Sequence, residues 1–91
     1  MLKCLHIYFS GRVQGVGFRF TANHLAKRHA LSGWVMNLPD GRVELLIQGE
    51  KENIDNFLAD LDEEFKGYIM NTEIEELPLK KDLKDFHIRF Y

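Results

Sequence analysis

A chain of 91 residues forms one domain at most, and its hydrophobic fraction of 45% argues against disorder. Its apolar runs are far too short to span a membrane. The net charge of −2 is divided unevenly, with +5 on residues 1–42 and −7 on residues 43–91. This asymmetry favours a small anion over a nucleic acid as ligand. The alternative is that the acidic residues only solvate the surface.

The first half of the chain predicts a strand, a helix and two further strands. Residues 3–10 alternate between apolar and polar, three glycines in residues 11–17 break that pattern, and residues 18–30 follow a helical period. Residues 32–38 and 42–48 predict two strands joined by a Pro-Asp-Gly turn.

The second half predicts a helix and two strands. An apolar stripe predicts a helix over residues 51–65, which ends at Gly67. Residues 69–77 predict a fourth strand, and the alternation over residues 86–91 predicts a short closing one. The expected core consists of Leu5, Ile7, Phe9, Leu25, Val43, Leu45, Ile47, Phe57, Leu58 and Leu61.

The order βαββαβ with a short last strand is typical of an α+β, ferredoxin-like split βαβ sandwich, with two helices on one face of an antiparallel sheet. The first two strands are joined by a helix, so they should run parallel with another strand between them. Parallel strands end at the same edge of a sheet. We therefore expect the glycine loop and Asn37, at the end of the second strand, to meet in space.

The glycine loop has the character of a phosphate site. Gly15 and Gly17 allow main-chain N–H groups to converge on an anion, beside the positive end of the following helix. Arg19 lies in the first turn, where a cation opposes the helix dipole unless an anion lies between them. A plain tight connection and a solvated arginine are the alternatives. The spacing matches no nucleotide-binding motif.

Asn37 has two interpretations. An asparagine beside a turn commonly bonds its own backbone. Its amide could instead orient a water molecule without changing its protonation state.

Two longer motifs carry a family resemblance. The segment GRVQGVGFR at residues 11–19 resembles the first acylphosphatase signature, and GWVMNLPDGRVE at residues 33–44 resembles the second. The segment FHIR at residues 86–89 resembles the closing strand of that family. The likeness makes residues 1–91 one acylphosphatase-like domain, although the stretch from Phe65 to Met70 lacks the proline turn of many relatives.

The resemblance implies hydrolysis of acyl phosphates to a carboxylate and inorganic phosphate, with no metal and no organic cofactor. Arg19 matches the phosphate-binding arginine of the family, and Asn37 matches its water-positioning asparagine. The phosphate cradle matches the main chain of Gln14, Gly15, Val16, Gly17 and Phe18. A pocket built on a loop should be shallow, and it should discriminate little between different acyl groups.

The expected partners are a small acyl phosphate, and inorganic phosphate or sulfate as ligands, with no nucleic acid and no membrane. We expect a monomeric, free-standing enzyme. The single cysteine and the lack of a signal peptide predict that it lies in the cytoplasm. The alternative is a non-catalytic phosphate or carbamoyl-phosphate binding module. An RNA-binding role needs stacked aromatic residues on a central strand, and residues 42–48 supply none.

Overall fold

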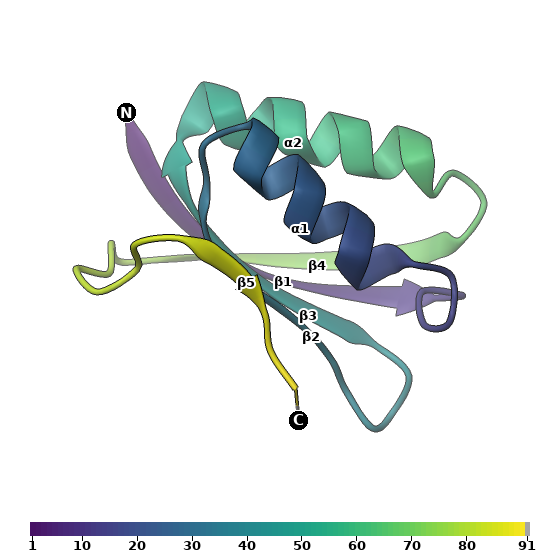
Figure 1. Ribbon diagram of the computed structural model, residues 1–91. Helices are drawn as coiled ribbons and strands as arrows, with labels where there is room; N and C mark the ends of the chain where they lie inside the picture. The colour runs from purple at the N-terminus through teal and green to yellow at the C-terminus, as the bar shows by residue number, and fades with distance from the viewer. Residues whose placement is uncertain (91) are drawn as a thin grey trace.

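The computed structural model describes residues 1–90, which form a mixed sheet with both helices on one face (Figure 1). The elements are β1 (Leu2–Gly11), α1 (Phe18–Arg28), β2 (Ser32–Asn37), β3 (Val43–Glu50), α2 (Lys51–Glu64), β4 (Ile69–Leu77) and β5 (Phe86–Ile88). The strand order is β4-β1-β3-β2-β5. Neither helix in the described part of the chain is long and apolar enough to cross a membrane.

The central strands confirm the predicted topology. β3 lies between β1 and β2 and pairs antiparallel with both, so β1 and β2 run parallel. In the β1–β3 register Phe9 faces Val43, and in the β2–β3 register Asn37 faces the same Val43. The ends of β1 and β2 therefore lie on one edge of the sheet, one on each side of β3.

The sheet is not wholly antiparallel as predicted, because β5 pairs parallel with β2. β4 ends at Leu77 beside Cys4, near the start of β1, and β2 starts at that same end of the sheet. The connection over residues 78–85 reaches the far edge along this end, where the side chain of Gln48 bonds the main chain of Lys80 at 2.7 and 2.8 Å. A strand that enters from the start of β2 has to run parallel to it.

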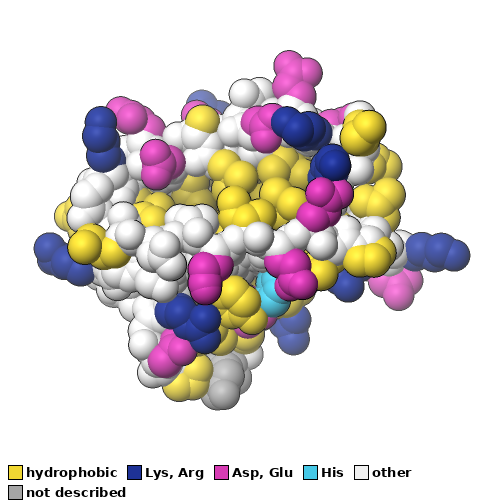
Figure 2. Space-filling view, turned by 180° about the vertical axis from the view of Figure 1, so that it is seen from behind, with side chains coloured by type: hydrophobic (Ala, Val, Ile, Leu, Met, Phe, Trp, Pro, Cys, Tyr) yellow, Lys and Arg dark blue, Asp and Glu magenta, His cyan; other side chains and the backbone are white. Residues whose placement is uncertain are grey.

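The core lies between the helices and the sheet. Eight of the ten predicted core residues are buried, whereas Leu5 and Leu58 are only partly buried and pack against the cluster. The edge strand β4 is mostly exposed. From behind, a band of hydrophobic side chains is visible between charged ones (Figure 2). On the opposite face of the sheet, Cys4 and Leu46 are also buried, which the alternation did not predict.

Several element ends differ from the prediction. α1 ends at Arg28 rather than at residue 30, because Ala30 adopts a left-handed conformation with φ of 57° that no helix continues. β5 ends at Ile88, so Phe90 follows the strand, and the predicted last strand residue, Tyr91, lies outside the described residues.

Candidate functional site

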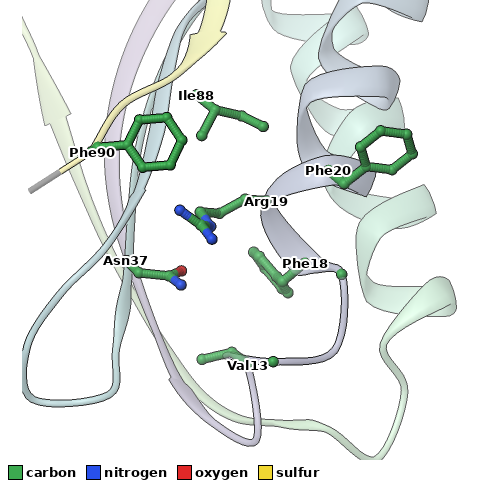
Figure 3. A pocket seen from close by; sticks show the side chains of 9 residues that line it. Val13, Phe18, Arg19, Phe20, Asn37, Ile88 and Phe90 are labelled. Atoms are coloured by element: carbon green, nitrogen blue, oxygen red, sulfur yellow. The ribbon is translucent and has the colours of Figure 1, made fainter.

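A cavity of about 200 Å³ opens at the edge of the sheet where β1 and β2 end (Figure 3). The loop after β1, the start of α1, the last residue of β2 and the segment around the end of β5 contribute to its wall. The lining residues are Val13, Gly15, Gly17, Phe18, Arg19, Phe20, Asn37, Ile88 and Phe90. The topology thus brings together segments that are far apart in the sequence, as the sequence predicted for the glycine loop and Asn37.

The loop leads directly into the N-terminus of α1. Gly15 and Gly17 have φ of 76° and 80°, a region that side-chain-bearing residues rarely adopt. Gly17 is the N-cap, no side chain caps the helix there, and the first turn contains no acidic residue. The first N–H groups of a helix have no intrahelical partner, so this end of α1 presents donors and positive potential to an anion.

Phe18 fixes the start of α1 against the core. Its ring is buried, with centroids 5.0 Å from the ring of Phe9 and 4.7 Å from that of Phe65. The main chain that follows is thereby held at the cavity while the side chain points into the core.

Arg19 is the only charged residue among those that line the described cavity. It is half-buried, and its guanidinium carbon lies 5.4 Å from the ring centroid of Phe90, within cation–π range. In Figure 3 the guanidinium lies between Phe90 and Asn37. No acidic residue of the described chain lines the cavity, so no opposing charge lies beside Arg19 on its wall.

Asn37 closes β2 on the face of the sheet that the helices cover. Its carboxamide points towards Arg19 (Figure 3). The Oδ1 atom is shielded from solvent and accepts no hydrogen bond from any residue within 1–90. A buried acceptor without a donor costs free energy, so this oxygen is a strong acceptor for a bound water or ligand.

Gln14 connects the two segments of the site. Its Nε2 donates to the carbonyl oxygen of Leu38 at 2.8 Å and to that of Arg42 at 2.9 Å, which are the two ends of the β2–β3 turn. Asp40 stiffens the same turn, because the main-chain N–H of Arg42 donates to it and thereby lowers the pKa of its carboxyl. The glycine loop and the strand end that carries Asn37 are therefore held in a fixed relation.

Five of the seven predicted site residues line the cavity, and two do not. Arg19, Asn37, Gly15, Gly17 and Phe18 line the cavity. Gln14 and Val16 do not, since the side chain of Gln14 reaches the turn and Val16 packs against the core.

Sequence reasoning did not select four lining residues, Val13, Phe20, Ile88 and Phe90. Phe20 carried a signal, because it is a large apolar residue off the buried stripe of α1. Ile88 and Phe90 were predicted only as part of the closing strand, and nothing in the sequence placed them at the cavity.

Comparison with known proteins agrees on one family. The sequence model described as Acylphosphatase matches residues 5–88. An acylphosphatase of Pseudomonas paraeruginosa is 46% identical over 78 residues, which cover 85% of this chain and 86% of the relative. The crystal structure of acylphosphatase from Bacillus subtilis superposes with a TM-score of 0.88 at 33% identity, covering 98% of this chain and 99% of that one. T. kodakarensis HypF matches with a TM-score of 0.80 at 34% identity, over 96% of this chain but 12% of its own.

Proposed function

The chain belongs to the acylphosphatase family, and from this premise we propose that it hydrolyses small acyl phosphates, with Arg19 and loop amides binding the phosphoryl group and Asn37 holding the attacking water. One observation carries the assignment of roles. Arg19, Gly15, Gly17 and Asn37 line a single cavity, and the Oδ1 of Asn37 is buried without a donor from the described residues. The main chain of Gln14 and Val16 completes the cradle in this proposal.

The proposed chemistry needs few groups. Water attacks phosphorus, and the bond from phosphorus to the acyl oxygen breaks. The leaving group is a carboxylate whose conjugate acid has a pKa of about 4, so it departs without a general acid. Phosphoryl transfer then depends on positioning and on stabilising the equatorial oxygens, which a guanidinium and main-chain N–H groups do well.

The proton of the attacking water also needs an acceptor. No residue that lines the cavity within the described chain is a base at neutral pH. In the proposal this proton therefore passes to a phosphoryl oxygen. Cys4 offers no alternative nucleophile, because it is buried and burial raises the pKa of its thiol.

The test is incubation of the protein with benzoyl phosphate in excess chelator, following the loss of the acyl phosphate. We expect metal-independent hydrolysis that inorganic phosphate or sulfate inhibits competitively. A protein that binds phosphate but leaves benzoyl phosphate intact would instead be a non-catalytic binding module. The family relatives that align over most of their own length favour the enzyme. The proposal includes action as a monomeric single domain in the cytoplasm.

Gln14 provides a prediction about positioning. In Gln14→Ala the loop loses both bonds to the β2–β3 turn, so the phosphate cradle and Asn37 are no longer held together. Because a misplacement of about 1 Å can cost about 100-fold in rate, we expect kcat to fall by about 10- to 100-fold. Steady-state assays with benzoyl phosphate measure this. The matched control is Gln48→Ala, which removes a comparable pair of side-chain bonds to the main chain of Lys80, away from the cavity, and should retain kcat.

A further inference from the structure

We propose that Phe20 and Phe90 form an apolar rim that binds the acyl group, so that the enzyme prefers acyl phosphates with a bulky apolar or aryl group. The inference rests on the proposed function and concerns the substrate class of the same site. It goes beyond the expectation of a shallow pocket that discriminates little between different acyl groups.

The cavity has a polar part and an apolar part. The cavity here measures about 200 Å³, and its inner wall is the loop, the start of α1 and Asn37. These polar groups suit the phosphoryl end. The acyl group then projects towards the rim, and the rim decides which acyl groups gain contacts.

The rim is apolar and exposed. Phe20 is 74% exposed and Phe90 79% exposed, although both are large hydrophobic residues. A single exposed phenylalanine needs no explanation. Phe20 and Phe90 line one cavity together with the partly buried Ile88 at the end of β5, so they form an apolar surface next to a polar one.

The two rings flank the phosphate-binding arginine. Figure 3 shows Phe90 on the β5 side of Arg19 and Phe20 on the α1 side. Phe90 is held in place because the N–H of Arg89 donates to the carbonyl oxygen of Val35 at 2.9 Å, which continues the pairing with β2 beyond Ile88. An acyl group that leaves the phosphoryl site therefore has Phe90 on the β5 side and Phe20 on the α1 side.

The charge of the lining also selects the acyl group. Arg19 is the only charged lining residue of the described cavity, and the phosphoryl group occupies it in the proposed function. A charged acyl group would find no counter-ion at the rim, whereas an apolar one would bury surface against phenylalanine. Burial of apolar area is favourable by about 25 cal/mol per Å².

The experiment compares two substrates in matched variants. kcat/KM is measured for benzoyl phosphate and acetyl phosphate in the wild type, Phe20→Ala and Phe90→Ala. We expect the ratio of benzoyl to acetyl phosphate to fall about ten-fold in each variant, the size of effect that a few lost apolar contacts produce. Inhibition by inorganic phosphate, which has no acyl group, should not change in Phe20→Ala. Met70→Ala is the control, because Met70 is 77% exposed on β4 and does not line the cavity.

The outcomes separate the two proposals. An unchanged substrate ratio in both phenylalanine variants overturns the acyl rim while leaving the hydrolase intact. An equal loss for both substrates in Phe90→Ala also counts against the rim, since it means that Phe90 acts only through its contact with Arg19. If the wild type hydrolyses neither substrate, the proposed function itself fails.

Discussion

Arg19→Ala is expected to lower kcat/KM for benzoyl phosphate by about 1,000-fold or more and to weaken inhibition by inorganic phosphate in parallel. The guanidinium is the only charge that lines the cavity among the described residues, and no acid there compensates for its loss. Both the ground state and the transition state carry phosphoryl charge, so binding and rate fall together. Steady-state kinetics and phosphate inhibition measure both effects.

Two further variants test whether geometry or charge matters at Arg19. Arg19→Lys keeps the charge but lacks the planar fork that meets two phosphate oxygens, so we expect about 100-fold loss of kcat/KM. Arg12→Ala is the matched control for the positive field, because Arg12 belongs to the same loop but its guanidinium lies over the ring of Tyr68 at 5.4 Å. It should retain activity. Equal losses in Arg12→Ala and Arg19→Ala would contradict a specific role for Arg19.

Stability distinguishes this role from a structural one. Arg19 opposes the dipole of α1, at a cost of about 0.3–1 kcal/mol. Its contact with Phe90 contributes about 0.5–1 kcal/mol in the opposite direction. These effects nearly cancel, so urea unfolding of Arg19→Ala should match the wild type. A large loss of stability would mean that the arginine serves the fold.

The fold was largely predictable because hydrophobic periodicity reports which face of an element is buried. The alternation of Leu5, Ile7 and Phe9 predicted β1, for example, and the apolar stripe over residues 51–65 predicted α2. The direction of β5 was not predictable in this way. It depends on the path of residues 78–85 along the end of the sheet, which Gln48 fastens at Lys80, and such a contact leaves no periodic signal.

The candidate site was predictable where topology and motif act together. The glycine loop and Asn37 follow parallel strands, so their meeting at one edge could be argued before any coordinates. The place of Phe90 could not be, because alternation predicts burial equally for Phe86 and Phe90. Only Phe86 reaches the core, at 2% exposure, whereas Phe90 lies beyond the paired part of β5.

Asn37→Ala is expected to lower kcat by about 100- to 1,000-fold while leaving affinity for inorganic phosphate largely unchanged. The proposed role of this side chain is to hold the attacking water, which phosphate binding does not require. Its Oδ1 atom is buried and accepts no hydrogen bond from residues 1–90, so the substitution removes no bond within these residues at this oxygen. Stability should be retained or slightly raised, because a buried acceptor without a donor costs about 1–3 kcal/mol.

Asn23 offers a closely matched control for this prediction. Its Oδ1 is likewise buried without a donor in the described chain, but Asn23 lies on α1 and does not line the cavity. Asn23→Ala should therefore resemble Asn37→Ala in urea unfolding and the wild type in kcat. The decisive measurement compares inhibition by inorganic phosphate in Asn37→Ala and in Arg19→Ala. If phosphate inhibition weakens equally in Asn37→Ala and Arg19→Ala, the two side chains do not divide binding and water positioning between them, and the proposed mechanism is wrong.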